Sequence, residues 1–210
     1  MGSSSNATQR IRYTLLAPVY DIMSRVFRRR RRRCLKVADL AAGERVLVVG
    51  AGTGLDLDFI SPGPVLTAID LTPAMLNRLR RRALRLGLEV DARVMDAAAL
   101  EFPDAAFDVV LLHLIVTVVP DPARCLREAA RVLRPGGRAV IFDKFCPDER
   151  RPPLGVRLIA PVARSLFGTR MTLRLGPLLE GTGLEVAQEE SAGLRGLLKI
   201  VLVRKKGVGH

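Results

Sequence analysis

The sequence predicts a doubly wound α/β domain built on a mainly parallel sheet. From Arg45 onward, short apolar runs alternate with longer helical stretches, which is typical of parallel strands covered by helices. Three alternating glycines, Gly50, Gly52 and Gly54, directly follow the first of these runs. Only the short stretch Ser191 to Gly196 separates the last two runs, so they predict an antiparallel hairpin at one end of the sheet.

Size and composition fit one domain with a sizeable core. The chain has 210 residues, of which 49% are hydrophobic and 26% are charged. No apolar run is long enough to span a bilayer, and the first residues lack the apolar centre of a signal peptide, so we expect a cytoplasmic protein. Cys34, Cys125 and Cys146 contain no Cys-x-x-Cys pair, and His113 and His210 are the only histidines. We therefore expect neither a metal site nor a Ser-His-Asp triad.

Positive charge is concentrated in two segments. Residues 1–40 hold 10 Lys and Arg against 2 Asp and Glu, and residues 144–176 hold 7 against 2. Residues 41–143 are nearly neutral, with 12 against 13. Charge localised in this way predicts contact with a polyanionic surface, either nucleic acid or an anionic lipid leaflet. The plainer interpretation is a set of solvated helix faces.

Residues 1–41 are predicted to form a basic, amphipathic helical arm ahead of the main domain, which spans 42–210. The arm contains an unbroken arginine run, formed by Arg28, Arg29, Arg30, Arg31, Arg32 and Arg33. On a helix such a run projects in every direction, so it cannot all face a core. A basic helix with an apolar side is typical of membrane surfaces. Because only Phe27 interleaves with the arginines, stacking of nucleic-acid bases is less favoured than contact with lipid.

The remaining elements follow from hydrophobic period and from glycine and proline positions. Strands are predicted near 45–49, 65–69, 91–94, 107–113, 138–143, 184–190 and 197–203. Helices are predicted near 56–60, 73–86, 122–133 and 171–181. Gly136 and Gly137 are expected to end a helix and to turn the chain into the next strand.

The glycine turn lies where doubly wound sheets bind ligands, beyond the carboxyl end of the first strand. Glycine tolerates the positive φ of a tight turn and lets a ligand approach the backbone closely. A nicotinamide-type fingerprint would need a third glycine at position 55, which is Leu55. The spacing therefore argues against the simplest dinucleotide site, although a glycine triplet alone is also compatible with a mere tight turn.

Carboxylates follow the second and third strands. Asp70 ends the second strand, from where it can accept both hydroxyls of a ribose. It could instead cap the following helix, for which Thr72 is the better candidate. Asp96 and Ala97 follow the third strand, where a carboxylate can accept a hydrogen bond from the exocyclic amine of adenine. Together with the glycine turn, these residues predict a nucleoside pocket.

Residues 45–143 resemble the class I S-adenosylmethionine-dependent methyltransferases. The matching motifs are the glycine turn, Asp70-Leu71, Asp96-Ala97, Phe102-Pro103-Asp104 ahead of Phe107-Asp108-Val109-Val110, and Val132-Leu133-Arg134-Pro135-Gly136-Gly137. The resemblance implies a Rossmann-like sheet of seven strands with the last strand antiparallel. It also implies S-adenosyl-L-methionine as cofactor and S-adenosyl-L-homocysteine as product.

The same resemblance assigns roles to the motif residues. Gly50, Gly52 and Gly54 would line the methionine part of the cofactor and Asp70 its ribose. The adenine would be surrounded by Leu71 and Met75, with Asp96 and Ala97 at its edge. The family usually has Glu or Asp two residues before the first glycine, where this chain has Val48. Main-chain carbonyls would then have to hold the ammonium group of the cofactor.

The flanking segments suggest the methyl acceptor. Tyr13, Ala17, Tyr20 and Asp21 reproduce the Y-x-x-x-A-x-x-Y-D pattern of methyltransferases that act on quinones and on phospholipid head groups. By this resemblance their helix covers the cofactor like a lid, with Tyr13 at the cofactor, although two tyrosines on one helix face are also ordinary packing residues. His113 follows the fourth strand, where such enzymes place residues that face the transferred methyl group. A lone histidine there can equally be a structural residue.

The arm, the tyrosine pair and the turn Val118 to Pro122 resemble bacterial phospholipid N-methyltransferases, which convert phosphatidylethanolamine stepwise to phosphatidylcholine. Residues 144–176 form a basic, apolar insert whose Arg151, Arg157 and Arg164 suit a lipid phosphate. The resemblance implies an enzyme at the inner face of the membrane, in which Tyr20 and His113 position the amine or relay its proton. One alternative is a quinone or other small-molecule methyltransferase. Another is a nucleic-acid-binding protein that keeps the fold without turnover.

Overall fold

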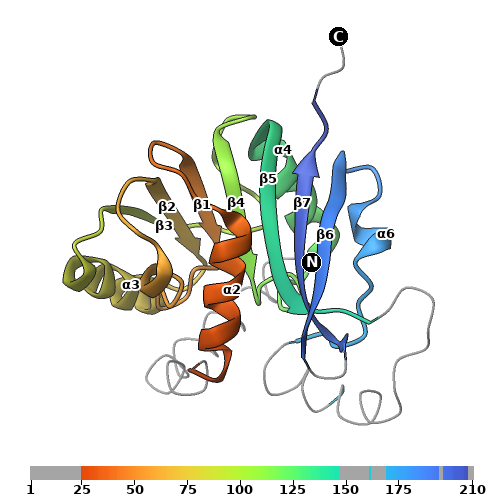
Figure 1. Cartoon of the computed structure of the whole chain (residues 1–210), viewed down its shortest axis with the longest axis horizontal. Helices are drawn as coiled ribbons and strands as arrows, with labels where there is room; N and C mark the ends of the chain where they lie inside the picture. Colours follow the sequence, from red (N-terminus) through yellow and green to blue (C-terminus); the bar gives the residue numbers. More distant parts are fainter. Residues whose placement is uncertain (1–24, 147–160, 162–168, 194–195, 208–210) are drawn as a thin grey trace.

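The computed structural model describes residues 25–146, 161, 169–193 and 196–207, and these form a seven-stranded sheet between two helical layers (Figure 1). The strands are β1 (Arg45–Val49), β2 (Val65–Asp70), β3 (Val90–Val94), β4 (Phe107–His113), β5 (Leu133–Lys144), β6 (Leu184–Gly193) and β7 (Leu198–Lys205). Their order across the sheet is β3-β2-β1-β4-β5-β7-β6. Strands β1 to β5 are parallel, and β7 is antiparallel to β5 and β6. The expected fold class is confirmed, including the antiparallel last strand.

Each face of the sheet has its own helical layer and its own apolar core. Helices α2 (Arg28–Ala38) and α3 (Pro73–Leu86) pack on one face, and α4 (Pro122–Val132) and α6 (Gly176–Leu179) pack on the other. Figure 1 shows α2 in front of the sheet and α4 behind it. Side chains of β1 alternate between the layers, with Val46 and Val48 on the α2 side and Leu47 and Val49 on the α4 side. No helix in the described part of the chain is long and apolar enough to cross a bilayer.

Proline and cap residues set the ends of the main helices. Helix α3 begins at Pro73, whose missing N–H costs nothing at a first helical position, and Gly87 ends it in the left-handed conformation with φ of 65°. Helix α4 begins with Pro122, and the side chain of Asp121 accepts a hydrogen bond of 2.9 Å from the N–H of Arg124. These helices therefore lie close to the ranges that the sequence predicts.

Three elements differ from the sequence-based expectation. Residues 56–60 form only a short 3-10 turn, η2 (Leu57–Phe59), because Pro62 and Pro64 follow too closely for a full helix. Helix α6 is one turn long, since Gly181 and Gly183 with positive φ end it. Strand β5 starts at Leu133, directly after α4, so Gly136 and Gly137 lie within an irregular stretch of strand rather than in a separate turn.

The described part of the basic arm is α2, preceded by the 3-10 turn η1 (Arg25–Phe27). Arg138 on β5 binds the carboxyl end of α2: its guanidinium donates to the carbonyls of Ala38 and Asp39, each at 2.6 Å. It also donates to both carboxylate oxygens of Glu44 at 2.8 Å. These hydrogen bonds from Arg138 lower the pKa of Glu44. One arginine therefore satisfies helix carbonyls and fixes the entry into β1.

We expect Arg138→Met to lower the free energy of unfolding by about 2–3 kcal/mol, because the helix carbonyls and Glu44 lose charged donors at a site where the arginine side chain is 15% exposed. Arg134→Met is the matched control on the same strand. Its guanidinium pairs with Asp108 but is 47% exposed, so the loss should stay within about 1 kcal/mol. Urea unfolding of both variants measures the difference, and equal losses would contradict this role of Arg138.

Candidate active site

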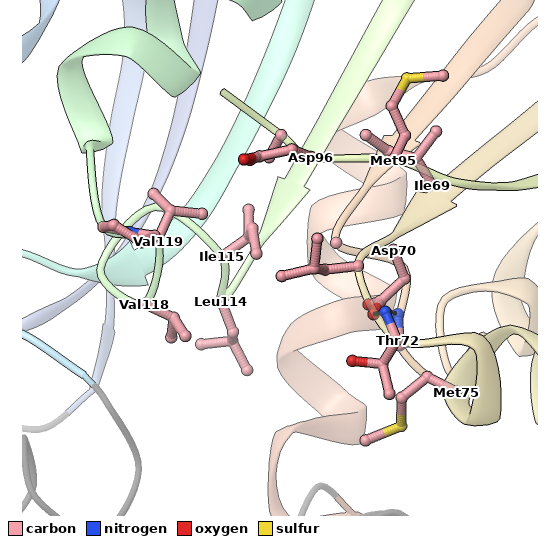
Figure 2. Close-up of a pocket in the computed structure, with 15 residues that line it drawn as sticks. Ile69, Asp70, Thr72, Met75, Met95, Asp96, Leu114, Ile115, Val118 and Val119 are labelled. Carbon is pink, nitrogen blue, oxygen red and sulfur yellow. Dashed lines mark hydrogen bonds between the residues drawn. The ribbon is translucent and has the colours of Figure 1, made fainter. Parts of the chain in front are cut away.

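A cavity opens beyond the carboxyl ends of the four parallel strands β1 to β4 (Figure 2). Its lining consists of Gly50, Gly52, Ile69, Asp70, Leu71, Thr72, Met75, Met95, Asp96, Ala97, Leu114, Ile115, Val118, Val119 and Pro120. Figure 2 shows Val118 and Val119 on one side of this space, and Asp70, Thr72 and Met75 on the other. The structure thus gathers most of the predicted cofactor residues around one cavity.

The glycine turn makes two close contacts that only glycine allows. Gly50, Gly52 and Gly54 have φ of 65°, 56° and 78°. A Cβ atom on Gly50 would lie 2.5 Å from Cδ1 of Ile115, so the turn approaches the loop after β4 without room for a side chain. A Cβ atom on Gly54 would lie 2.9 Å from Cγ of Leu79 on α3. Gly54 is therefore a packing position beneath the cavity and does not line it.

Asp70 links the glycine turn to α3 through its carboxylate. One oxygen accepts the N–H of Gly52 at 2.9 Å, and the other accepts the N–H of Thr72 at 2.8 Å. Burial raises the pKa of Asp70, and the hydrogen bonds from the two backbone N–H groups and from the Thr72 side chain oppose this rise only in part. Thr72 occupies the first cap position of α3, but its side chain makes no capping hydrogen bond. The preference for Thr72 over Asp70 as the cap residue is therefore confirmed by position, although the Thr72 side chain accepts no N–H of the helix.

Asp96 supports the turn after β3 and lines the same cavity. Its carboxylate accepts the N–H of Ala98 at 2.9 Å, which closes a short side-chain turn. Figure 2 shows Asp96 at one end of the cavity and Met75 at the other. Asp70 and Asp96 thus line one cavity, from the ends of two neighbouring strands. A nucleoside with its sugar at Asp70 and its base at Asp96 fits this arrangement.

The loop after β4 forms an apolar wall of the cavity. It begins with Leu114, whose φ of 61° is unusual for a residue with a side chain, and whose N–H donates to the carbonyl of Phe142 at 2.6 Å. Asp143, fully buried at the end of β5, accepts from the N–H of Thr117 at 3.0 Å and from its hydroxyl at 2.7 Å. The hydroxyls of Thr117 and Thr169 lie 3.0 Å apart. A buried carboxylate therefore fixes the loop, and the sequence analysis did not single it out.

A buried ionic triad, formed by Arg31, Asp56 and His113, lies beside the glycine turn. Asp56 accepts from a guanidinium nitrogen of Arg31 at 2.8 Å, and its other oxygen lies 2.9 Å from Nδ1 of His113. All three side chains are at most 6% exposed. Burial alone would raise the pKa of Asp56, but attraction to Arg31 and His113 outweighs it and holds this pKa well below the usual range. The triad connects α2, the turn after β1 and the end of β4.

His113 is oriented by this triad rather than by the cavity wall. In its neutral form, the imidazole of His113 donates from Nδ1–H to the carboxylate of Asp56, so its lone pair is on Nε2. That nitrogen is buried and has no hydrogen-bond partner among the described residues. His113 does not line the cavity, whereas the next residue, Leu114, does. The structure therefore places the predicted histidine next to the site, on the side of the sheet that α2 covers.

The arginine run divides between the domain and its surface. Arg31 is buried in the triad, so it takes no part in the lipid contact that the sequence predicts for the arginine run: a helix packed on a sheet must turn some of its residues inward. Arg30 donates to the carbonyl of Ala192 at 2.5 Å, and Arg33 pairs with Glu190 at 2.6 Å. The exposed members are Arg28, Arg29, Arg32 and Arg33, of which Arg33 is the one paired with Glu190. The predicted site residues Tyr13, Tyr20, Arg151, Arg157 and Arg164 lie outside the described residues.

Sequence reasoning missed Asp56 and the inward role of Arg31. A signal for Asp56 was present, because it is a single carboxylate between two leucines, Leu55 and Leu57, directly after the glycine turn. An acidic residue in such an apolar stretch is either exposed or paired. The partner could not be found in the same way, since Arg31 is one member of a uniform run.

The cavity fits the cofactor that the motifs imply. Gly50 leaves the backbone open at the end of β1, and a side chain there would fill the turn. Each oxygen of Asp70 accepts one backbone N–H, which leaves further lone pairs for ribose hydroxyls. Leu71, Met75 and Ala97 supply apolar surface in the same cavity as Asp70 and Asp96. These residues would hold the adenosine of S-adenosylmethionine with the glycine turn beneath its methionine part.

We expect Asp70→Asn to weaken S-adenosylhomocysteine binding at least about 10-fold, because an amide NH2 would oppose the N–H of Gly52 or Thr72 and one charged acceptor would be lost. Asp91→Asn on the neighbouring strand is the control, since its carboxylate is exposed and pairs with Arg93 on the same strand. Calorimetric titration of both variants tests this. Unchanged affinity of the Asp70 variant would remove this residue from the cofactor site.

The raised pKa of Asp70 also predicts that cofactor affinity falls on acidification at a higher pH than an ordinary aspartate would give, because protonation removes an acceptor. The same calorimetric titration, repeated in a series of buffers, measures this.

We expect Asp56→Asn and Arg31→Met each to lower the free energy of unfolding by about 3–5 kcal/mol, because each leaves a buried partner uncompensated. The double variant should lose much less than the sum, since it removes both charges. Urea unfolding of the four proteins gives the coupling energy, and additive losses would show that the pair contributes nothing.

The depressed pKa of Asp56 gives this pair a pH dependence. When the pH falls to the ordinary pKa of an aspartate and below it, Asp56 takes up a proton in the unfolded state but not in the native state. The free energy of unfolding should therefore rise with pH through this range and fall on acidification. This rise should be smaller in Asp56→Asn than in the unchanged protein. Urea midpoints measured from acid to neutral pH test the sign.

The relatives of this chain in sequence are methyltransferases. Residues 47–141 match the family model described as a methyltransferase domain. A phosphatidylethanolamine N-methyltransferase of Cereibacter sphaeroides is 46% identical over 111 residues, which are 52% of this chain and 55% of that protein. The chain thus matches just over half the length of this relative. A demethylmenaquinone methyltransferase of Thermus thermophilus is 38% identical over 177 residues, which are 80% of this chain and 77% of that protein.

Solved structures agree at the level of the fold. A putative methyltransferase from Bacillus halodurans superposes with a TM-score of 0.72 at 19% identity, covering 83% of this chain and 97% of that one. The cyclase SpnF gives a TM-score of 0.79 at 20% identity, with 98% and 97% covered. A cyclase on this fold shows that architecture alone does not set the reaction. The family is shown by the sequence relatives and by the motif residues around the cavity. The chain belongs to the class I S-adenosylmethionine-dependent methyltransferases.

Proposed function

We propose that the protein transfers methyl groups from S-adenosylmethionine to the amine of phosphatidylethanolamine and of its methylated intermediates, at the surface of an anionic membrane. The observation that carries the proposal is the apolar wall across the cavity from Asp70, formed by Leu114, Ile115, Val118, Val119 and Pro120. Such a wall suits an acceptor with a large apolar part. The 46% identity with a phosphatidylethanolamine N-methyltransferase supports an amine lipid as that acceptor.

The cofactor residues orient the methyl donor. When bound, S-adenosylmethionine supplies a sulfonium methyl group that is already activated toward a nucleophile. Asp70 accepts hydrogen bonds from the ribose, and Asp96 does so at the adenine edge. Gly50 and Gly52 let the methionine part lie against the backbone. The main contribution of the protein is then to align the acceptor nitrogen with the donor and to exclude water.

An ammonium acceptor must lose a proton before its nitrogen can attack. His113 is suited to this step because Asp56 accepts at Nδ1 and leaves the lone pair of Nε2 without a partner among the described residues. Tyr20, from the part of the chain outside the described residues, is the second group that we assign to the amine. Tyr20 positions the amine or takes up its proton, whereas His113, which does not line the cavity, takes up the proton through a water molecule.

Positively charged residues of the arm and of the insert are assigned to binding of the membrane surface. Arg28, Arg29 and Arg32 are exposed on α2, and guanidinium groups bind phosphate with two parallel hydrogen bonds. We assign these residues, with Arg151, Arg157 and Arg164 of the insert, to lipid phosphates. The protein then works as a peripheral enzyme on the inner face of the membrane.

Methylation of a quinol is the second candidate. It is favoured by the alignment with a demethylmenaquinone methyltransferase, which extends over 80% of this chain. The apolar wall would accept a quinone ring and its prenyl tail equally well. A quinol has no phosphate, however, and would make no use of the exposed arginines.

Incubation of the protein with labelled S-adenosylmethionine separates the two candidates. Vesicles that contain phosphatidylethanolamine should yield labelled mono-, di- and trimethylated lipid, whereas vesicles that contain demethylmenaquinol should yield no labelled quinone. Asp91→Asn should match the unchanged protein, and Asp70→Asn should lose most of the activity. Label found only in the quinone would establish the second candidate, and label in neither lipid would refute both.

A further inference from the structure

The exposed arginines of α2 form one stripe along the helix. Arg28, Arg32 and Lys36 recur every four residues, which places them on one face, and Arg29 lies beside them. The inward face carries Arg31, which is buried in the ionic triad. The stripe is therefore a consequence of how α2 is seated.

This stripe borders a hollow between α2 and η2. The hollow is lined by the four basic residues of the stripe together with Leu35, Asp58, Phe59, Ile60 and Ser61. The guanidinium carbon of Arg28 lies 5.3 Å from the ring centroid of Phe59, a distance at which the ring attracts the cation. Cations thus rim a partly apolar depression.

Helix α3 carries a second stripe of basic residues, of which Arg81 and Arg85 are exposed and Arg78 and Arg82 are half-buried. Arg78, Arg81, Arg82 and Arg85 follow helical spacing and line a hollow of their own. Arg82 pairs with Asp58 of η2 at 3.8 Å. Leu84, in the same turn of the helix, is 81% exposed, and Val26 ahead of α2 is 64% exposed. Apolar side chains therefore stand beside cations on both helices.

The two stripes belong to one surface. Helices α2 and α3 pack on the same face of the sheet, and Asp58 and Phe59 of η2 contact basic side chains of both. The two hollows together contain four basic residues from each helix, and Asp58 is the one acidic residue that lines them among the described residues. The sequence analysis missed the α3 stripe, because residues 41–143 are neutral when counted together.

We propose that the outer faces of α2 and α3 form one docking surface for an anionic lipid leaflet, to which α3 contributes as much as the arginine run. The choice of lipid as partner rests on the proposed function. Basic side chains bind the phosphate layer, and the exposed Leu84 and Val26 enter the headgroup region. A nucleic acid is the less suitable partner, because Phe59 is the single aromatic ring among the described residues that line these hollows, and it already lies against Arg28.

The position of α3 connects docking with the active site. Its first turn contains Met75, which lines the cofactor cavity, and the basic stripe begins one turn later at Arg78. η2 directly follows the glycine turn. Docking through this face therefore holds the cavity close to the lipid from which the substrate must come, and shortens the path of the head group.

Vesicle binding by charge-matched variants tests the surface. Arg81→Gln/Arg85→Gln removes two exposed charges from α3, and Arg124→Gln/Arg127→Gln removes two exposed charges from α4 on the opposite layer. The probe is sedimentation with phosphatidylcholine vesicles that contain phosphatidylglycerol, without cofactor. We expect the α3 variant to bind about 25-fold more weakly, at roughly five-fold per charge, and the α4 variant to bind like the unchanged protein. Thermal melting checks that both variants remain folded.

Equal losses in both variants would overturn the proposal, because net charge alone would then explain binding, and so would an unchanged α3 variant. A loss of RNA or DNA binding in the α3 variant with vesicle binding intact would overturn it in favour of a nucleic acid. Methyl transfer to phosphatidylethanolamine in neutral detergent micelles tests the function separately. If the protein binds vesicles through α3 but transfers no methyl group, the proposed function alone is refuted. If it transfers methyl groups but the α3 variant binds vesicles as well as the unchanged protein does, the docking surface alone is refuted.

Discussion

The buried carboxylate of Asp56 is the constraint on which the arrangement of this domain depends. A carboxylate shut off from water beside a glycine turn must find cationic and hydrogen-bonding partners, and it finds Arg31 on α2 and His113 on β4. The pairing with Arg31 sets the rotation of α2 about its own axis. Cys34, Leu35 and Ala38 then face the sheet, and the remaining cations of the helix either reach β6 or point to solvent.

A second buried carboxylate fixes the other end of the same region. Asp56 holds the side chain of the last residue of β4, and Asp143 holds Thr117 four residues further on. Between them the chain turns at Leu114 with a positive φ and presents Ile115 against the glycine turn. The loop that forms the apolar wall is thus held just before its start and at its middle by carboxylates that do not line the cavity. The residues of this loop that line the cavity can all be apolar, because Thr117, which does not line it, makes the polar contacts that hold the loop.

The fold and the cofactor residues were predictable because their signals are local. Strand and helix periods, the glycine spacing and carboxylates at strand ends are each contained in a few consecutive residues, and Gly50, Asp70 and Asp96 follow from them. The inward turn of Arg31 was not predictable, since it depends on a partner 25 positions away and on which face of α2 meets the sheet. The α3 stripe was hidden for a related reason. Counting charge along the chain sets its arginines against carboxylates such as Asp108, which the fold places on a different element.

The apolar residue at position 48 follows from the same buried charge. Val48 faces the α2 layer of β1, in register with Ala68 and Leu111, and is almost fully buried. The family's usual acidic residue at this position would add a second carboxylate to the layer that holds Asp56. Arg31 is already bound to Asp56, and two carboxylates that share one guanidinium in a dry core repel each other. Because Asp56 already places a carboxylate in this layer, an apolar side chain at position 48 is more stable there than an acidic one. The negative charge beside the glycine turn is therefore carried by the residue after the turn, in place of one on the strand before it.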